Sequence, residues 1–546
     1  MIVSNYIFVF LVSICIIDAF GITGWGSMTL DDACHRKMKF WCCRNEATAP
    51  MMAEGYARST GKPCAVVLTA GPGSSNSVPG LSEAFVDGAP IFIVSGQVPT
   101  KHFSSHRSFG TAGIDIISIV QPLTKFCVTV HEPELIKFYL EKAYWFMLEG
   151  HPGPVWLDIP FNVQQAEVPN EMDSFQPPKL EKSSQSIDYE SIISLFNKAK
   201  SPLLLVGHGV RISKAEKEVC QLIQSLQLPF VVTRFMNDFL PFSHKLNMGL
   251  VGIKGKKYNK ALMQSADTIL VLGSSLPPTV IGENGEFINP KAKIIRVDIS
   301  DDQRLDIFIK SDIKEFIKGL PQNQIKPAPE IWIDYCQQLK REHAEFVTDD
   351  MKKNPMDLYR FMKTLDGHLN QDMIVTTEAG GNYYSSGQVF EFNQGAKELT
   401  SVSFAAMGVS LPLAIGASVG NPSKSVVAIV GDGGLELNIQ ELKTISFEHL
   451  NIKIFVLENN GYTSMVKWQQ EYFEGRLIEK PGQNSLDLEQ IAKAFNLSYC
   501  NLNNHKTLDQ DLINILSKKG PLFIEVTINP NGGIMTPLEN ISLFSK

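Results

Sequence analysis

The sequence predicts an α/β protein of three consecutive parallel-sheet domains, each with helices on both faces of its sheet. Short runs rich in β-branched residues alternate with longer helical patterns along almost the whole chain, which is typical of strand–helix–strand units. The length of 546 residues is too great for a single hydrophobic core, because one domain usually holds about 100–200 residues. This organisation favours an enzyme over a structural protein.

Apolar runs of strand length predict the buried strands. Polar, proline-rich stretches at 169–188 and 321–330 divide these runs into three groups and are typical of linkers. We therefore expect domains at 1–170, 190–320 and 331–546, with a Rossmann-like sheet in the central one. The predicted strands are 65–69, 91–95 and 155–159 in the first domain, 203–206, 268–272 and 293–297 in the second, and 374–376, 425–430, 452–457 and 522–526 in the third.

Composition and charge exclude several classes of protein. Hydrophobic residues make up 44% and charged residues 20% of the chain, as in folded globular proteins. The formal net charge of −7 argues against a general polyanion-binding surface and hence against nucleic acid as a partner. Nine scattered cysteines without a C-x-x-C pair indicate free thiols in a reducing, cytoplasmic compartment.

The apolar run at 6–17 has two interpretations. It could be the central region of a signal peptide or the buried first helix of the first domain. No Lys or Arg precedes Arg36, and no small-x-small cleavage site follows the run, so we expect the buried helix. Twelve residues are too few to span a bilayer, and we expect no membrane association.

The strongest functional signal lies at the ends of two strands of the third domain. The strand at 425–430 runs into Gly-Asp-Gly-Gly at 431–434, and the strand at 452–457 is followed by Glu-Asn-Asn-Gly-Tyr at 458–462. Ligands bind at the carboxyl ends of parallel strands, and one strand–helix–strand unit would bring Asp432 and Asn459 together. The side-chain oxygens of Asp and Asn are typical ligands of Mg²⁺, which could also bind diphosphate oxygens. Glycines just before a helix let the backbone approach a phosphate group at the positive end of the helix. An ordinary strand–helix–strand unit remains the alternative, since Gly-Asp-Gly turns are common.

The combined pattern resembles the thiamine-diphosphate motif of the pyruvate decarboxylase and acetolactate synthase superfamily. This resemblance implies that the metal ligands are Asp432, Asn459 and the carbonyl of Gly461. It also implies that the residues beside the diphosphate are Gly431, Gly433, Gly434 and Tyr462. The family usually has Asn where this chain has Glu458; that position is not a ligand in the motif, so metal binding is expected to survive.

Thiamine activation needs a Glu that hydrogen-bonds the pyrimidine N1′ atom, and Glu46 is the candidate. It follows a strand-like run at 40–43 and precedes a helix at 49–60. Taken alone, it could be a solvated charge at a helix start. However, M-A-E-G-Y-A-R, T-G-K-P, A-G-P-G-S-S-N and S-G-Q-V follow it in the order found in the pyrimidine-binding domain of acetolactate synthases.

That resemblance makes the first domain the pyrimidine-binding domain and the third the diphosphate- and Mg²⁺-binding domain. It implies that Glu46 activates the cofactor, that Gln97 faces the reacting substrate, and that Gly24, in F-G-I-T-G-W-G, lies in the first glycine-rich turn of the site. The family's H-E-Q is Asn-Glu-Ala at 45–47 here, which implies altered substrate handling.

Further segments match less specifically. In S-F-A-A-M-G, Met407 takes the place of the family's bulky residue under the cofactor, although a methionine in an apolar helix would by itself be core filling. Gly380 and Gly381 follow the strand at 374–376 and are expected at the diphosphate edge, although a strand-end turn would need them too. The helix from Met465 resembles one that closes over the active site, with Trp468 either facing substrate or packed on the helix.

The central domain shows only general nucleotide-binding form. L-L-L-V-G-H-G-V-R at 203–211 does not complete G-x-G-x-x-G. After the strand at 268–272, where acetolactate synthases have an R-F-D-D-R-like sequence that holds FAD, this chain has G-S-S-L-P-P at 273–278, without the arginines. We therefore expect FAD to be absent or weakly held.

The resemblance implies a thiamine-diphosphate- and Mg²⁺-dependent enzyme that decarboxylates a 2-oxo acid, most simply pyruvate, and couples the product to a second carbonyl. The reaction implied by the resemblance is that of acetolactate synthase, a transferase of branched-chain amino acid biosynthesis. No His pair lies beside Glu46, which favours ligation over aldehyde release. The alternatives are a related enzyme acting on another oxo acid or a sugar-pathway carbonyl, and a non-catalytic binding relative. The family also implies a homodimer or homotetramer with each active site across an interface.

Overall fold

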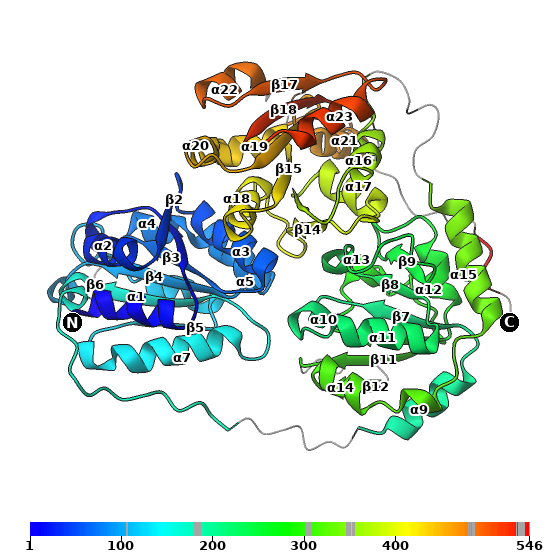
Figure 1. Cartoon of the computed structure of the whole chain (residues 1–546), viewed down its shortest axis with the longest axis horizontal. Helices are drawn as coiled ribbons and strands as arrows, with labels where there is room; N and C mark the ends of the chain where they lie inside the picture. Colours follow the sequence, from blue (N-terminus) through cyan, green and yellow to red (C-terminus); the bar gives the residue numbers. More distant parts are fainter. Residues whose placement is uncertain are drawn as a thin grey trace.

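The computed structural model describes the whole chain except residues 105–106, 180–186, 301–306, 346–350, 352–354, 479, 481, 483–485, 531, 533–540 and 545–546. Within the described residues there are three parallel sheets of six strands each. Figure 1 shows the first domain in blue and cyan, the central domain in green, and the third domain in yellow to red above them. All ten strands predicted from the sequence are present, so the predicted fold class is confirmed. Part of the first predicted linker, 180–186, lies outside the described residues.

The first sheet has the strand order β2-β1-β3-β4-β6-β5. Its strands are β1 Asp18–Gly21, β2 Lys39–Cys42, β3 Cys64–Leu68, β4 Ile91–Gln97, β5 Phe126–Thr129 and β6 Val155–Pro160. The helices are α1 Val3–Ser13, α2 Met28–Lys37, α3 Thr48–Thr60, α4 Pro72–Asn76, α5 Val78–Val86, α6 Ile116–Val120, α7 Ile136–Leu148 and α8 Phe161–Gln164.

The apolar run near the N-terminus forms most of α1. Its inner face, with Ile7, Phe8 and Leu11 fully buried, packs in one core cluster with residues of α2 and α7. The predicted buried first helix is thus confirmed. The described part of the chain has no helix that is both long and apolar enough to cross a membrane.

The central sheet has the order β12-β11-β10-β7-β8-β9, the strand order of a Rossmann fold. Its strands are β7 Pro202–Val206, β8 Phe230–Val232, β9 Asn247–Leu250, β10 Thr268–Leu272, β11 Lys293–Asp298 and β12 Ile307–Lys310. The helices are α9 Tyr189–Lys198, α10 Gly209–Ile212, α11 Glu216–Leu226, α12 Asn259–Ser265, α13 Pro278–Ile281 and α14 Ile313–Gly319.

The third sheet, β14-β13-β15-β16-β18-β17, repeats the strand order of the first. Its strands are β13 Met373–Thr377, β14 Lys397–Thr400, β15 Ser425–Gly431, β16 Ile452–Glu458, β17 Tyr499–Leu502 and β18 Leu522–Thr527. The helices are α16 Leu358–Asp366, α17 Gly381–Val389, α18 Ser410–Gly420, α19 Asp432–Asn438, α20 Leu442–Phe447, α21 Thr463–Tyr472, α22 Leu488–Ala494 and α23 Leu508–Ser517.

One further helix, α15 Glu330–His343, packs on the central domain. The predicted boundary at 331 would assign it to the third domain. Its apolar positions Trp332, Cys336 and Leu339 recur at helical spacing and are buried in the core around the central sheet, which explains its position. The aromatic ring of Phe544 lies against Trp332, so the C-terminal segment returns to the same place (Figure 1).

The first and third domains meet where α3 crosses α18. A Cβ atom on Gly55 would lie 2.3 Å from the carbonyl oxygen of Leu413, and one on Gly416 would lie 1.8 Å from that of Met52. The two glycines therefore let the helix backbones approach more closely than any other residue would allow. This contact fixes the first and third domains of one chain against each other.

Candidate active site

The third domain gathers its predicted metal ligands at the carboxyl ends of β15 and β16. Asp432 is 5% exposed. Its Oδ2 atom accepts hydrogen bonds from the backbone N–H groups of Gly461 at 2.8 Å and Asn459 at 3.3 Å, and its Oδ1 accepts one from Gly433 at 2.8 Å. The parallel pairing of β15 with β16 places the two loops side by side. The structure thus brings together the three residues that the sequence motif predicted as ligands.

The donor set fits a hard divalent cation. The Oδ1 atom of Asn459 is buried and accepts no hydrogen bond from any described residue, and a buried acceptor is rarely left without a partner. The carbonyl oxygen of Gly461 accepts one bond, from Thr463 N–H at 2.7 Å, which leaves its second lone pair. Carboxylate, amide and carbonyl oxygens are the ligands that Mg²⁺ prefers. These residues could therefore hold the metal.

The glycines around this loop are required for two different reasons. A Cβ on Gly434 would lie 1.8 Å from Oε1 of Glu378, and one on Gly433 would lie 2.8 Å from the ring of Tyr462. By contrast, Gly380 has φ +119° and open space beside it, with Gly381 beginning α17. Gly433 and Gly434 therefore allow close packing against Tyr462 and Glu378, and Gly380 leaves room for a ligand at the neighbouring strand end.

Glu378 is a functional candidate that the sequence analysis missed. It follows β13, it is 1% exposed, and its carboxylate accepts hydrogen bonds from the N–H groups of Gly431 at 3.0 Å and Ser410 at 3.3 Å. Burial raises the pKa of this carboxyl to about 8. A glutamate directly after a buried strand, two residues before Gly380, was the available signal. Glu378 ties the glycine loop to the start of α18.

Met407 lies close to this loop. The sequence suggested a helix, but residues 403–409 form a loop before α18, with Ala405 at φ +57° and Gly408 at φ +74°. The side chain of Met407 is 37% exposed, and Leu437, beside Gly408, is 50% exposed. The methionine is therefore not core filling within one chain.

The first domain presents Glu46 at the carboxyl end of β2. The side chain is half-buried, and its Oε2 accepts a hydrogen bond of 2.8 Å from Nδ2 of Asn76, the last residue of α4, the short helix that follows β3. The same Nδ2 bonds Oδ1 of Asn45 at 3.0 Å. Gly24 follows β1, donates to Asp31, and has no space for a Cβ, which would lie 2.5 Å from Thr69. Three strand ends of the first sheet therefore converge around Glu46.

Gln97 is 1% exposed and has its polar atoms engaged inside the first domain. Its Nε2 donates to the carbonyl of Ile114 at 2.9 Å and to Asp158 at 3.1 Å, and its Oε1 accepts from Val98 N–H at 3.0 Å. The structure does not bring Gln97 together with Glu46 through any of these bonds. A role toward substrate would require it to exchange them.

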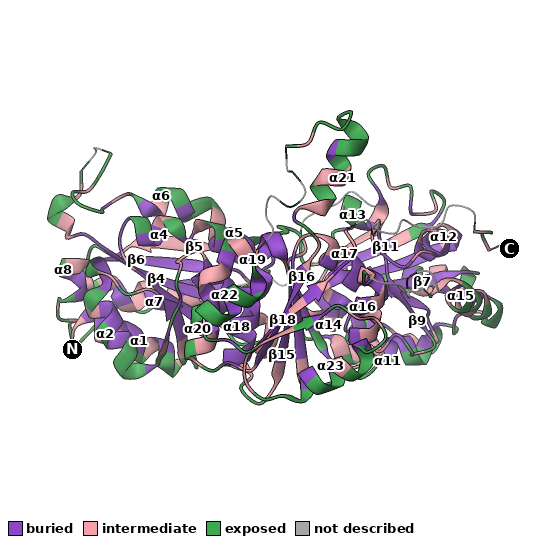
Figure 2. Ribbon diagram, turned by 90° about the horizontal axis from the view of Figure 1, so that it is seen from above, coloured by how far each residue is buried: buried purple, intermediate pink, exposed green. Residues whose placement is uncertain are grey.

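Among the described residues of one chain, Glu46 and Asp432 share no hydrogen bond with each other. The loop with Glu46 contacts the third domain through Glu441, nine positions beyond Asp432. Large apolar side chains on α21 are exposed instead: Trp468, 58% exposed, stacks on Tyr472, also 58% exposed. Figure 2 shows α21 rising from the face of the molecule with mostly exposed residues. Trp468 is thus not packed in the core of its own chain.

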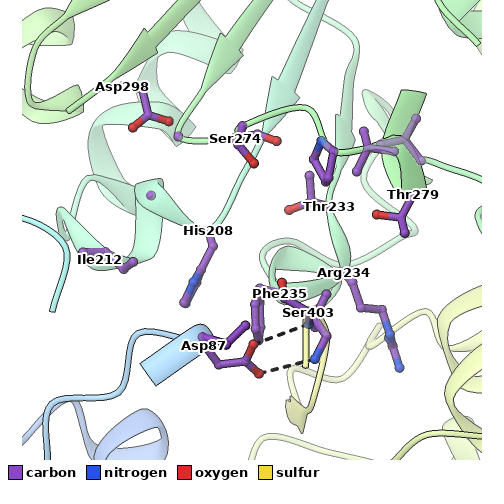
Figure 3. Close-up of a pocket in the computed structure, with 18 of the residues that line it drawn as sticks. Asp87, His208, Ile212, Thr233, Arg234, Phe235, Ser274, Thr279, Asp298 and Ser403 are labelled. Atoms are coloured by element: carbon purple, nitrogen blue, oxygen red, sulfur yellow. Dashed lines mark hydrogen bonds between the residues drawn. The ribbon is translucent and has the colours of Figure 1, made fainter. Parts of the chain in front are cut away.

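A cavity of about 910 Å³ lies where the three domains meet. It opens at the carboxyl ends of β7 and β10, between which the strand order of the central sheet reverses, the usual ligand position in such sheets. In Figure 3, His208 and Asp298 of the central domain, Asp87 of the first and Ser403 of the third face this space. Asp87 accepts hydrogen bonds from the N–H groups of Val402 and Ser403.

Three thiamine pyrophosphate enzyme domains match the chain: the N-terminal TPP binding domain at 1–119, the central domain at 189–320 and the C-terminal TPP binding domain at 378–526. The chain is 30% identical to the acetolactate synthase isozyme 1 large subunit of Escherichia coli (strain K12), over 93% of this chain and 91% of that protein. It is 29% identical to the acetolactate synthase large subunit of Lactococcus lactis subsp. lactis (strain IL1403), over 94% and 90%. It is 28% identical to the chloroplastic acetolactate synthase 1 of Nicotiana tabacum, over 94% and 79%.

The fold and the site, with these matches, define a three-domain enzyme of the thiamine pyrophosphate-binding class. The chain belongs to the acetolactate synthase-like family of thiamine pyrophosphate enzymes, and it resembles the large, catalytic subunits along nearly its whole length.

Proposed function

We propose that this protein is a thiamine-diphosphate- and Mg²⁺-dependent enzyme that decarboxylates a 2-oxo acid, foremost pyruvate, and joins the resulting fragment to a second carbonyl compound. One observation carries the proposal: the carboxylate of Asp432 lies on a loop adjacent to that of Asn459, whose buried amide oxygen has no partner among the described residues, and glycines surround both. The acetolactate synthase names of its full-length relatives support the choice of reaction.

When bound, thiamine diphosphate supplies a nucleophilic carbon and accepts the electrons released with CO₂. The residues of this chain bind and orient it. Asp432, Asn459 and the Gly461 carbonyl would hold Mg²⁺, and the open space beside Gly380 would leave room for the diphosphate. Glu46 shares a proton with the pyrimidine N1′ atom, and Asn76 fixes the direction of its carboxylate. Met407 supports the middle of the cofactor.

The complete site is proposed to form between two chains of a homodimer or larger assembly. Glu46 and Asp432 lie in different domains, and the exposed apolar residues Met407, Leu437 and Trp468 leave the third-domain half open. Exposed apolar residues of this size around a site are typical of an interface. A second chain would cover them and supply the other half-site. We also propose a cytoplasmic location, which the free cysteines support, and a place in branched-chain amino acid biosynthesis.

We also propose that the central cavity holds no tightly bound FAD, because two of its arginines and the N–H of its glycine turn already have partners. Arg234 makes a two-pronged ion pair with Glu398 at 2.5 and 2.6 Å, and Arg296 donates to Asp298 and Ser300. The N–H of Gly209, in the glycine turn after β7, is bonded to the carbonyl of Gly273. These donors are therefore already engaged and would have to exchange their partners to bind a dinucleotide diphosphate.

Product analysis tests the reaction. The purified protein is incubated with pyruvate, Mg²⁺ and thiamine diphosphate, and acetolactate is measured against acetaldehyde. We expect acetolactate and CO₂, and none without the cofactor. Acetaldehyde as the main product would show that the enzyme only decarboxylates pyruvate and does not perform carboligation. Turnover confined to 2-oxobutyrate or longer oxo acids would mean that pyruvate is not the substrate. The absence of turnover with any oxo acid would overturn the proposal.

A further inference from the structure

A buried glutamate of the third domain holds the loop that carries Glu46. Glu441 lies in the turn between α19 and α20 and is 0% exposed. Its Oε1 accepts hydrogen bonds from the backbone N–H of Arg44 at 2.8 Å, the N–H of Asn45 at 3.1 Å and the hydroxyl of Thr48 at 2.8 Å. One carboxylate oxygen thus binds three donors of the first domain, on both sides of Glu46.

The second oxygen of this carboxylate is also fixed. Oε2 of Glu441 accepts a hydrogen bond of 2.8 Å from the hydroxyl of Thr444, and that hydroxyl lies 3.4 Å from the carbonyl of Cys42 at the end of β2. Since the Glu441 side chain is fully buried and both of its oxygens accept hydrogen bonds, the four bonds set a single position for the carboxylate. A buried carboxylate is tolerated only when it is satisfied in this way.

The contacts continue from Glu441 to the carboxylate of Glu46. Asn45, held at its N–H by Glu441, accepts at Oδ1 from Nδ2 of Asn76, and the same Nδ2 donates to Oε2 of Glu46. The loop itself is closed by the N–H of Ala47, which donates to Asn45 Oδ1 at 2.9 Å. A displacement of Asn45 would therefore turn the pair of asparagines and move the carboxylate of Glu46.

We propose that Glu441 is a positioning residue for cofactor activation, which sets the Glu46 carboxylate from the third domain of the same chain. The inference rests on the proposed function, because it takes Glu46 as the group that meets the thiamine pyrimidine. Glu441 touches neither cofactor nor substrate in this arrangement. Its loss would leave two amides and a hydroxyl without their acceptor and free the loop.

The test measures cofactor activation apart from cofactor binding. The proton–deuterium exchange rate at the thiazolium C2 atom of bound thiamine diphosphate is followed by NMR after acid quench, and the Kd of the cofactor is measured by calorimetry. In Glu441→Ala we expect exchange and kcat to fall about tenfold or more while the Kd changes less than about threefold, since small displacements of a reacting group have large effects. Glu441→Gln, which keeps an acceptor oxygen, restores part of the rate.

Two further variants keep the outcome decisive. Thr48→Val removes one of the three donors and is expected to lower the exchange rate in the same direction, by less, even if Glu441→Ala does not fold. Glu448→Ala changes a carboxylate at the end of α20 that takes part in none of these hydrogen bonds, and should match the wild type.

Exchange rates in Glu441→Ala and Thr48→Val within about twofold of the wild type would overturn the inference, as would a loss of cofactor affinity that accounts for the whole effect. If the wild-type protein binds the cofactor but does not accelerate its exchange, then the proposed function has failed as well. That result is seen in the wild type alone and is distinct from the comparison of variants.

Discussion

The carboxylate of Asp432 accepts a hydrogen bond of 2.8 Å from the backbone N–H of Gly461, although the two residues are 29 positions apart. The pairing of Gly431 with Leu457 in the adjacent strands β15 and β16 explains this contact, because both strands end at the same edge of the sheet. Hydrogen bonds of the Asp432 carboxylate to the N–H groups of Asn459 and Gly461 join the two loops.

Asp432→Ala is expected to weaken Mg²⁺-dependent binding of thiamine diphosphate about 100-fold, because it removes the charged ligand of the metal. Calorimetry with and without Mg²⁺ measures the change. Asp372→Ala is the matched control, since this exposed carboxylate precedes β13 at the opposite edge of the same sheet. Equal affinities in the two variants would refute the assigned ligand.

Glu46→Gln should lower turnover about 10²- to 10⁴-fold, the usual contribution of a positioned acid–base group. Its amide keeps the size of the side chain but cannot share a proton with the pyrimidine nitrogen. Cofactor affinity should change little, because the metal and diphosphate contacts lie in the third domain. Steady-state kinetics and calorimetry on the same preparation separate the two effects. Unchanged turnover would contradict the mechanism.

Mixing two inactive variants tests the position of the active site. If Glu46 of one chain works with Asp432 of another, a heterodimer of Glu46→Gln and Asp432→Ala chains has one intact site. Random reassociation of equal amounts should then recover about a quarter of wild-type activity. If both residues of one site come from the same chain, the mixture stays inactive.

The same heterodimer locates the effect of Glu441. Its intact site uses Glu46 of the chain that carries Asp432→Ala. Adding Glu441→Ala to that chain should reduce the recovered activity, because Glu441 holds the Glu46 loop of its own chain. Adding it to the other chain should leave the activity nearly unchanged. Equal losses in the two arrangements would indicate a general structural effect.

Sequence reasoning found the strands of five or more residues and missed most of the shorter ones, including the buried β8 and β9. The runs 426–430 of β15 and 454–457 of β16 are buried on both faces and therefore appear as continuous apolar runs. The edge strand β5 has every residue only partly buried, and β17 includes an exposed residue, so neither shows such a run. Their positions depend on pairing with distant strands.

The candidate site could likewise be predicted from the sequence only in part. Asp432 and Asn459 could be predicted because each follows a recognisable strand. Glu441 could not, because its partners Arg44 and Asn45 are nearly 400 positions away and no local pattern links them. The loop at Met407 was also missed, since Ala405 adopts a positive φ that its residue type rarely favours. Tertiary contacts decide both features.

The purified protein is expected to lack flavin absorbance, and its denatured supernatant to contain no stoichiometric FAD. Since Arg234 and Arg296 are already bound to carboxylates, titration with FAD should show only weak quenching of flavin fluorescence. Arg234→Lys, which breaks the two-pronged pair with Glu398, should not create tight binding. Stoichiometric release of FAD on denaturation would disprove the expectation.

A buried acidic cluster predicts how stability depends on pH. Glu54, Glu83 and Asp87 have carboxylate oxygens within 4.8 Å of one another, and Arg58 is the cation paired with two of them. Burial, with Glu54 and then Asp87, raises the pKa of Glu83 above its usual value. The folded state therefore binds more protons than the unfolded chain above the ordinary carboxyl pKa of about 4.3. The free energy of unfolding should therefore fall as pH rises from about 4.3, the pKa of an unfolded Glu, to about 9, the raised pKa of Glu83 in the folded protein.

Glu83→Gln removes this proton uptake while keeping the shape of the side chain, and its amide can donate to the neighbouring carboxylates. The variant should gain free energy of unfolding relative to the wild type as pH rises, by about 1 kcal/mol or more between pH ~5.5 and ~8.5. Urea midpoints at the two pH values measure the gain. Glu489→Gln, on the exposed face of α22, should show no such trend. A Glu83→Gln difference that is the same at both pH values would mean that Glu83 titrates normally in the folded protein.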